Sequence, residues 1–360
     1  MPQEGHPQAT HWEQPNCGSG PIRPIPFHSG RKLVFSMRIL FTGVNPGIDS
    51  SLEHKASIAS VAKRHGHIVC QALWEAPEVV ICVDYQKSFR PLLTEAKKLG
   101  IPCVLVKQEP VVVFPQHGKA NPGGLFNEVV TRGDPSSQPI FNTFQEWDAS
   151  RIDFPKRMGR VVAISANKWS MIPGEYYSLR RRVFAKDSRV DLFGPGWNEV
   201  FSTQLLRVIK EIVISLRFRF MPTIGNIRWA FLKPASYLGV AKSKVETLSS
   251  YKVSLVIENN GSYMSEKLVD CILAGTIPVY VGESISGFQV PQDLVVVSRP
   301  EVGSIIESID EALSWDSYEF RLRAKEWASR EGIKERWESE YVIVRLLDHV
   351  QDKITSYRRP

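Results

Sequence analysis

The sequence predicts an α/β fold made of two Rossmann-like domains that face each other across a cleft. Three observations support this prediction. Apolar runs of strand length alternate with segments of helical periodicity, the 360 residues suffice for two domains of about 150 residues each, and an irregular region divides the alternation in two. Because the strands are apolar along their whole length, we expect parallel sheets that are covered by helices on both faces.

The first half of the alternation begins at Met37 and is expected to form a domain over residues 37–150. One helix is expected over 51–65, because its periodicity stops at Gly66, and a second helix is expected over 88–100. The apolar runs that we expect to be strands are 37–44, 68–73, 78–84 and 101–107.

Two stretches differ from this alternation. Residues 1–36 are rich in Pro, Gly, His and polar residues and lack the apolar stretch of a signal peptide, so we expect a disordered extension. Residues 108–150 contain several glycines and prolines. Because a long irregular stretch inside a compact chain is usually functional, we expect active-site loops there, followed by the crossover to the second domain.

The second half is expected to form a domain over residues 151–345, followed by a C-terminal helix and tail over 346–360. The expected strands are 159–167, 189–197, 251–259, 277–281 and 292–299. The expected helices are 175–187, 202–220, one that begins near Ser265, and several within 301–356. The two halves show no internal repeat in their sequences.

The composition restricts the partners and the compartment. The net charge of +7 and the pI of about 9.1 favour an anionic partner: a nucleic acid, an acidic membrane surface or a phosphorylated small molecule. The basic residues are dispersed and no RNA-binding motif is visible, which argues against nucleic acid. The five cysteines lack metal-like spacing and four of them lie in apolar segments, so we expect reduced thiols in a cytoplasmic protein.

Residues 251–282 contain the clearest candidate site. A predicted strand ends at Glu258, a polar loop follows, and Ser265 is expected to be a helix N-cap, which places Glu266 and Lys267 in the first helical turn. Ligands of open α/β sheets bind beyond the carboxyl ends of the strands, near helix N-termini. The helix start and Lys267 would hold a diphosphate, and Glu266 would accept hydrogen bonds from sugar or ribose hydroxyls. A charge pair at a helix start is ordinary by itself, but together with this loop and strand it favours a nucleotide-sugar site.

The stretch over 248–282 reads LSSYKVSLVIENNGSYMSEKLVDCILAGTIPVYVG and resembles the donor-binding motif of the α1,3-fucosyltransferases (family 10 glycosyltransferases) and their bacterial relatives. The matching positions are Tyr251, Lys252, Glu258, Asn259, Tyr263, Ser265, Glu266, Lys267, Ala274, Gly275, Pro278 and Val279. The resemblance implies a GT-B fold whose C-terminal domain binds the nucleotide sugar, most often GDP-fucose, and whose N-terminal domain binds the acceptor. It further implies inverting transfer to a hydroxyl of a glycan acceptor, of the bacterial surface polysaccharide or glycoconjugate type. Asn259, Tyr263, Glu266 and Lys267 would then contact the donor.

The resemblance also implies functional residues outside this motif. Family members carry a phosphate-binding arginine near the first helix of the donor domain, and Arg180 is our choice from the basic run 180–182, with Lys168 as a second candidate. A solvated basic helix face is the alternative interpretation of this run. The strand over 101–107 is followed by Glu109, which matches the proposed general base of the family. The alternative for Glu109 is an ordinary loop carboxylate.

One carboxylate suffices for the implied chemistry. An inverting transferase must remove a proton from the acceptor hydroxyl as that oxygen attacks the anomeric carbon, in a transition state that resembles an oxocarbenium ion. The leaving diphosphate needs charge stabilisation rather than a proton. No convincing Asp-x-Asp pair stands at a strand end, so an obligatory metal is not expected, and a loosely bound Mg²⁺ or Mn²⁺ stays an open alternative. The competing hypotheses are an exostosin-like GT-B enzyme with another donor and an inactive nucleotide- or glycan-binding module.

The predicted helix over 202–220 combines an apolar stripe with basic and aromatic neighbours. The stripe consists of Leu205, Leu206, Ile209, Ile212, Val213 and Leu216. Two interpretations stay open. The helix docks on the anionic inner face of a membrane as a peripheral contact, or it packs on its own sheet with its charges in solvent. The chain has no run of about 18 apolar residues, so no transmembrane span is expected.

Overall fold

The computed structural model describes residues 36–43, 58–131, 147, 149–153 and 158–357. All of them belong to one compact unit, Leu33–Pro360. The extension predicted over 1–36 lies outside the described residues except for its last residue. The first part of the helix predicted over 51–65 also lies outside them.

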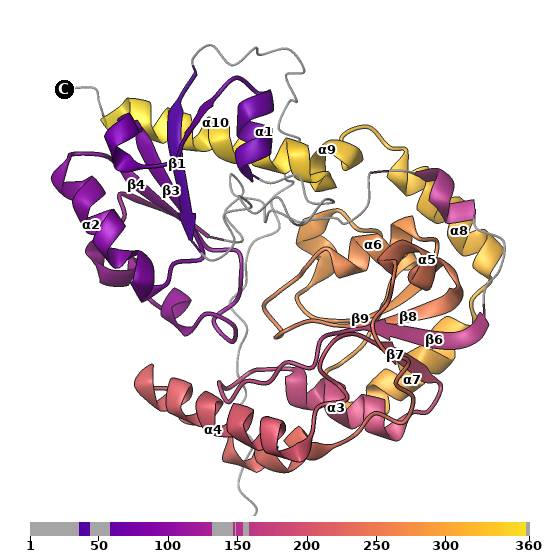
Figure 1. The fold of residues 1–360 in the computed structure, drawn as a ribbon. Coiled ribbons are helices and arrows are strands. Elements are labelled where there is room, and N and C mark those ends of the chain that lie inside the picture. The colour runs from indigo at the N-terminus through magenta and orange to yellow at the C-terminus, as the bar shows by residue number, and fades with distance from the viewer. Residues whose placement is uncertain (1–35, 44–57, 132–146, 148, 154–157, 358–360) are drawn as a thin grey trace, which may run out of the picture. The chain divides into compact units, whose positions relative to one another are not determined.

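Five parallel strands form the first sheet in the order β2-β1-β3-β4-β5 (Figure 1). These strands are β1 (Arg38–Gly43), β2 (Ile68–Cys70), β3 (Val79–Val83), β4 (Cys103–Val106) and β5 (Glu128–Val130). The helices packed on them are α1 (Ile58–Arg64), α2 (Arg90–Lys98) and α10 (Ser339–Tyr357). Ile39 and Phe41 of β1 pack with α1 and α10, whereas Leu40 between them packs with α2. The sheet is therefore buried on both faces, as its apolar strands predict.

Five parallel strands also form the second sheet, in the order β10-β9-β8-β6-β7. These strands are β6 (Met158–Ile164), β7 (Val190–Phe193), β8 (Tyr251–Ile257), β9 (Ile277–Val281) and β10 (Val296–Val297). The helices around them are α3 (Tyr177–Lys186), α4 (Phe201–Arg217), α5 (Lys244–Ser249), α6 (Lys267–Leu273), α7 (Val302–Ser314), α8 (Ser317–Ala328) and α9 (Ile333–Trp337). In Figure 1, α3 and α7 lie on one side of this sheet, and α5 and α6 lie on the other.

The two parallel, helix-covered sheets confirm the predicted α/β fold class. When the strands are counted within each sheet, both sheets have the order 2-1-3-4-5, in which ligands bind beyond the strand ends where the order reverses. That switch point lies between β1 and β3 in the first sheet and between β6 and β8 in the second. Gly43 ends β1 with a φ of 118°, and a Cβ at this position would overlap the carbonyl oxygen of Val83.

The edge strands β5 and β10 differ from the prediction. β5 lies within 108–150, which we expected to be irregular, and it continues the sheet beside β4. It is three residues long and only Val130 is buried, so its sequence has no apolar run. The strand predicted over 292–299 is reduced to Val296–Val297, because Gln292–Leu294 forms a 3₁₀ turn instead.

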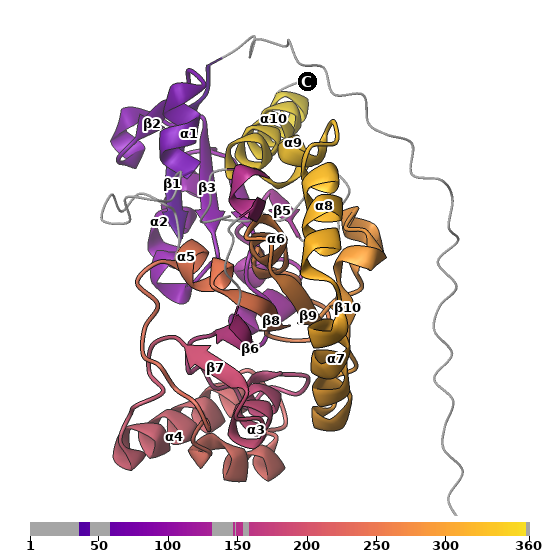
Figure 2. The same cartoon turned by 90° about the vertical axis from the view of Figure 1, so that its right-hand side faces the viewer.

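The C-terminal helices return the chain to the first sheet (Figure 2). Residues of α8 and α9 belong to the core of the second sheet, whereas α10 packs on α1 and inserts Ile343, Leu347 and Val350 into the core of the first. Because α10 begins at Ser339, the boundary predicted between residues 345 and 346 falls inside one continuous helix. Within the described part of the chain, no helix has both the length and the apolarity that a membrane span requires.

Candidate active site

A buried carboxylate follows β8 at the switch point of the second sheet. Glu258 has no exposed surface, and its carboxylate accepts hydrogen bonds from the backbone N–H and the hydroxyl of Ser265, both at 2.7 Å. The ammonium of Lys267 lies 3.3 Å from the second carboxylate oxygen and donates to the Ser265 hydroxyl at 2.9 Å. This network holds the Lys267 ammonium, whose side chain is 26% exposed, at the point where α6 begins.

Ser265 does not act as the predicted N-cap. Helix α6 begins at Lys267, Glu266 occupies the N-cap position, and no side-chain cap is formed there. The Ser265 hydroxyl donates to the Glu258 carboxylate instead, because a hydrogen bond to a carboxylate is stronger than one between neutral groups. The serine therefore connects the strand end with Lys267.

Glu266, at the N-cap position of α6, forms an ion pair with Lys244 of α5. Its carboxylate lies 3.4 Å from the ammonium of Lys244, which also contacts the fully buried Asp270. Burial would raise the pKa of Glu266, but the charges of Lys244 and Lys267 outweigh it and lower that pKa. Burial raises the pKa of Asp270 to about 6, against the opposing effect of Lys244. We did not predict Lys244, and the only sequence signal for it is two carboxylates four residues apart on a buried helix.

Arg180 is buried and attached to the end of β8. Its guanidinium donates to the carbonyl oxygen of Ile257 at 2.5 and 2.9 Å and to the side-chain oxygen of Asn259 at 3.0 Å. The ring of Tyr177 lies 5.0 Å from the guanidinium carbon. Burial lowers the pKa of Arg180, and these acceptors hold the guanidinium in place. The structure thus brings Arg180 together with Asn259, two of the predicted donor residues.

The interpretation of the basic run as a solvated helix face is wrong for Arg180 and Arg181. Arg181 is 2% exposed, donates to the Ala230 carbonyl at 2.6 Å and to the Asn167 side chain, and lies over the rings of two tryptophans. Arg182 is half-buried and lies over the ring of Trp229. The run therefore attaches α3 to its surroundings.

A small cavity of about 20 Å³ is lined by residues of β6, β8, α3, α5 and α6, and the strand order reverses between these two strands. Its wall includes the cationic side chains of Arg180, Lys244 and Lys267, with the Ser165 and Ser254 side chains beside them. Three cations from three different helices therefore converge near the strand ends of the second sheet.

Glu109 follows β4 of the first sheet, and its backbone is held from both sides. Its N–H and that of Gln108 donate to one carboxylate oxygen of Asp84, at 3.2 and 2.8 Å. Its carbonyl oxygen accepts a 2.7 Å hydrogen bond from Nδ1 of His117. The Glu109 carboxylate lies 3.5 Å from the hydroxyl of Tyr263, which precedes the Glu258-bound Ser265 in the second half of the chain. The structure thus brings the predicted base and the predicted donor motif into contact.

Asp84 and His117 support Glu109 and were not predicted as site residues. Asp84 is fully buried directly after β3 and adopts a φ of 53°, a conformation that Asp tolerates better than most residues. Burial lowers the pKa of His117 to about 4, so its imidazole is neutral, with Nδ1 as the donor to Glu109. The sequence signal for Asp84 was its position as a charged residue directly after an apolar strand.

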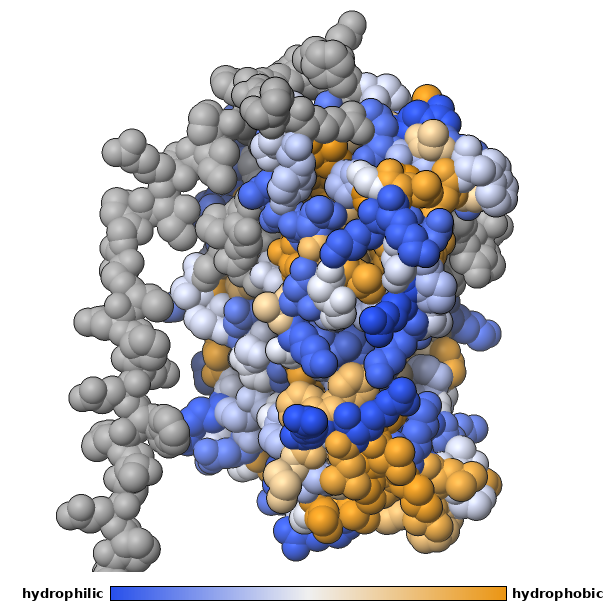
Figure 3. Space-filling view, turned by 90° about the vertical axis from the view of Figure 1, so that its left-hand side faces the viewer, coloured by the Kyte–Doolittle hydropathy of each residue, from blue (hydrophilic) through white to orange (hydrophobic). Residues whose placement is uncertain are grey.

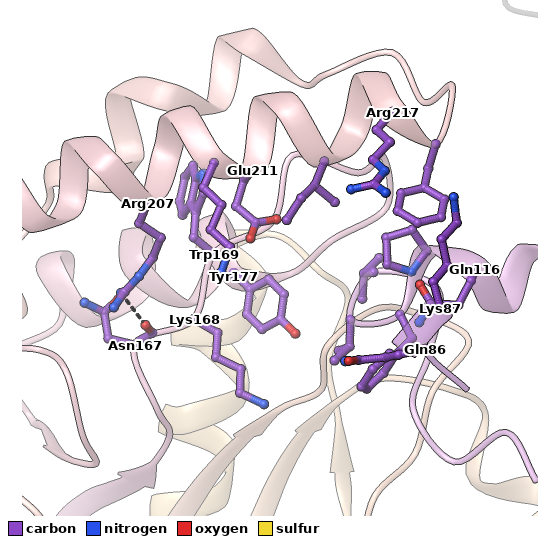
Figure 4. A pocket seen from close by; sticks show the side chains of 17 residues that line it. Gln86, Lys87, Gln116, Asn167, Lys168, Trp169, Tyr177, Arg207, Glu211 and Arg217 are labelled. Carbon is purple, nitrogen blue, oxygen red and sulfur yellow. Dashed lines mark hydrogen bonds between the residues drawn. The ribbon is translucent and has the colours of Figure 1, made fainter. Parts of the chain in front are cut away.

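A pocket of about 530 Å³ lies beside these residues (Figure 4). Lys168 and Tyr177 point into it, and Lys168 forms no ion pair with any residue that the structure describes. Its wall is formed by 86–87, 112–116, 167–169, Tyr177 and the α4 side chains Arg207, Lys210, Glu211, Ile214 and Arg217, with Phe218 after them. Of the predicted site residues, only Lys168 lines this pocket. Tyr177 connects it with Arg180.

Other candidate chemistry is limited. Across the described residues, no group of three or more His, Cys, Asp or Glu side chains has the arrangement of a metal site. The four described cysteines are buried and form no disulfide, and burial raises the pKa of Cys82 and Cys271 to about 12. These thiols are therefore packing residues rather than nucleophiles.

Comparisons with known proteins extend only to the fold. No protein-family model and no curated protein matches the chain. An α1,3-fucosyltransferase structure superimposes with a TM-score of 0.51 and 14% identity, covering 89% of this chain and 91% of that one. HepE from Anabaena, in complex with UDP and glucose, superimposes with a TM-score of 0.52 and 11% identity, covering 88% of this chain and all of that one. An α,α-trehalose 6-phosphate synthase from Burkholderia multivorans superimposes with a TM-score of 0.51 and 11% identity, covering 90% of this chain and 99% of that one. These similarities establish a GT-B fold.

Proposed function

We propose that the chain is an inverting glycosyltransferase that moves a sugar, fucose from GDP-fucose, onto a hydroxyl of a glycan acceptor. The observation that carries this proposal is the 3.5 Å approach of the Tyr263 hydroxyl to the Glu109 carboxylate. This contact links Glu109, whose backbone is held by hydrogen bonds, to the loop that leads to Lys267. The GT-B fold and the resemblance of residues 248–282 to the fucosyltransferase donor motif support the same assignment.

Glu109 is the general base in this proposal. As the acceptor oxygen attacks the anomeric carbon, its proton moves to the Glu109 carboxylate, the new glycosidic bond forms, and the bond from the anomeric carbon to the diphosphate oxygen breaks. The Glu109 N–H donates to Asp84, and the Glu109 carbonyl accepts from His117, so both hydrogen bonds hold the backbone that carries this carboxylate. Tyr263 holds the carboxylate end toward the donor.

Cations of the second sheet stabilise the departing diphosphate. Lys267 is the principal one, because Glu258 and Ser265 orient its ammonium before the donor arrives. We assign Arg180 to positioning Asn259 against the donor, since its own donors are already engaged by Ile257 and Asn259. Lys168, from the wall of the larger pocket, is a second contact for the diphosphate or the acceptor.

Nucleotide binding is the first test. We expect calorimetry to detect GDP and GDP-fucose binding, and Lys267→Met to weaken it about 10- to 100-fold, because a hydrogen bond to a charged group contributes about 1.5–3 kcal/mol. Lys186→Met, at an exposed position of α3, is the matched control and should bind normally. Selective binding of UDP would instead favour the alternative donor class, and no binding of any nucleotide would overturn the proposal.

Turnover is the second test. Glu109→Gln should lower kcat for transfer about 100-fold or more, because it removes the proton acceptor while keeping an oxygen that Tyr263 can reach. The Kd for GDP should stay within about threefold of the original chain, since the donor contacts are unchanged. Glu95→Gln, which alters an exposed α2 carboxylate paired with Lys98, controls for loss of charge.

The configuration of the product, the occurrence of transfer or donor hydrolysis, and the effect of metal ions on turnover distinguish the proposed mechanism from its alternatives. Inverted anomeric configuration in the product is required, and retention would contradict the proposed mechanism. Nucleotide binding without transfer or donor hydrolysis would identify a binding module instead. Assays with EDTA and with added Mg²⁺ or Mn²⁺ test the expectation that no metal is obligatory.

A further inference from the structure

Helix α4 presents an uncovered apolar face. We call this surface the α4 face; it consists of Val200, Phe201, Leu205, Leu206, Ile209, Val213 and Leu216, continued by Met221 and Ile224. Each of these side chains is exposed, Leu206 to 68% and Met221 to 82%. Figure 3 shows the corresponding apolar area in its lower part, where α4 lies. Contiguous apolar patches of this kind are uncommon on soluble monomers and mark interaction sites.

The predicted alternative, in which the stripe packs on the protein's own sheet, is wrong. Val208 and Ser215 are the buried residues of α4, and of the predicted stripe only Ile212 packs with Val208. Val208 packs with Trp169, Met171 and Ala230. Two further contacts attach the helix: Phe201 stacks on Phe231, and Arg207 donates to the Asn167 carbonyl oxygen. The other five stripe residues, Leu205, Leu206, Ile209, Val213 and Leu216, are exposed.

Positive charge is concentrated around the α4 face. Residues 199–233 contain six basic and two acidic residues, a net charge of +4 out of +7 for the whole chain, and one of the two acidic residues, Glu199, pairs with Arg207. Lys210, Arg217 and Arg219 are exposed, and none of them has an ion pair with a described residue. Exposed apolar side chains flanked by unneutralised cations are typical of helices that lie in the interface of an anionic membrane.

We propose that the α4 face docks the protein on an anionic lipid surface, with α4 lying parallel to that surface. A second copy of the chain fits less well, because a symmetric contact would bring the exposed cations Lys210, Arg217 and Arg219 of the two copies toward each other. A lipid surface instead supplies an apolar layer for the stripe and negative head groups for the cations beside it.

The docked orientation has a consequence for the larger pocket, which rests on the proposed function. Lys210, Ile214 and Arg217 of α4 also line this pocket. An acceptor that is anchored in the membrane by an anionic lipid would therefore meet the pocket directly at the lipid surface. Docking itself does not depend on the activity, so the two can fail separately.

Vesicle co-sedimentation of the full chain tests the docking. We expect binding to vesicles of phosphatidylcholine with phosphatidylserine, little binding to phosphatidylcholine alone, and weakening as salt is raised. The double variant Leu206→Glu with Leu216→Glu should bind at least about tenfold more weakly, since it places two anions in the apolar stripe. The control, Leu99→Glu with Leu322→Glu, alters two side chains that are 57% and 52% exposed elsewhere, and it should bind normally.

Other results of these measurements would contradict docking on a lipid surface. Failure of the original chain to bind anionic vesicles at low salt, or equal binding by both double variants, would overturn the proposal. A concentration-dependent dimer that the Leu206→Glu/Leu216→Glu variant loses, without vesicle binding, would identify a self-association surface instead. Unchanged thermal unfolding and GDP binding of that variant separate loss of docking from misfolding and from failure of the proposed function.

Discussion

The two sheets have the same strand order but use the residue after their third strand differently. Asp84 follows β3 and Glu258 follows β8, so the two carboxylates occupy corresponding positions, and both are fully buried. Asp84 accepts two backbone N–H groups and lies 3.6 Å from the neutral imidazole of His117. Glu258 accepts a backbone N–H and a hydroxyl and pairs with the ammonium of Lys267.

The difference shows how one framework can prepare two kinds of chemical group. In the first sheet the buried carboxylate fixes the backbone of the loop that carries Glu109, the base of the proposed mechanism. In the second it fixes a side chain and thereby places a positive charge. A buried carboxylate needs several donors in either case, and the identity of those donors decides what the site presents.

Replacing each buried carboxylate by its amide should produce the largest difference in stability between the two positions. Glu258→Gln is expected to lower the free energy of unfolding by roughly 2–4 kcal/mol, because it leaves the Lys267 ammonium facing an amide group. Asp84→Asn should cost about 1 kcal/mol or less, since the amide oxygen still accepts both backbone N–H groups. Urea unfolding at neutral pH measures both values. Equal losses would mean that charge pairing does not distinguish the two positions.

Acid should affect the first sheet through His117. Because the pKa of His117 is about 4 in the folded chain and about 6.5 in the unfolded chain, the unfolded state binds more protons between these values. This contribution to stability is complete above about pH 6.5 and falls by roughly 3 kcal/mol as the pH drops to 4. His117→Gln keeps a donor for the Glu109 carbonyl and should flatten this pH dependence. An unchanged slope in urea unfolding from pH 7 to pH 4 would contradict the prediction.

Gly282, directly after β9, tests how tightly the second carboxylate is packed. A Cβ there would lie 2.8 Å from Cγ of Glu258 and would overlap the hydroxyl of Tyr280. Gly282→Ala should therefore cost about 1–3 kcal/mol and weaken nucleotide binding by displacing Glu258. Gly303→Ala on α7 meets no atom within 4 Å and should change stability by less than about 1 kcal/mol. Thermal unfolding of both variants measures the contrast.

Sequence patterns predicted the features that follow from burial along a continuous run. The central strands were found because they are mostly apolar runs, and α2 was found by its periodicity and its final Lys-Lys-Leu-Gly. β5 was missed because an edge strand of three residues, one of them Glu128, has too little buried surface to show a pattern. The shared strand order was also invisible, since it results from pairings between distant segments and leaves no repeat in the sequence.

The candidate site residues also divide into those that a local sequence pattern indicates and those that it does not. The helix start after a strand end indicated Lys267, and the resemblance of residues 248–282 to the fucosyltransferase donor motif indicated Glu258 and Tyr263. Lys244 reaches Glu266 from 22 positions upstream, and His117 reaches Glu109 only after the intervening segment folds back. Such partners are determined by tertiary packing, so a single sequence carries no local signal for them.

The return of α10 to the first sheet has a consequence for the order of folding. Ile343, Leu347 and Val350 complete a core whose strands lie more than 200 residues earlier in the chain. During synthesis, the first sheet leaves the ribosome with one apolar face only partly covered, and it stays so until the last helix has been made. The half that supplies the proposed base is thus the first to be translated and the last to be completed.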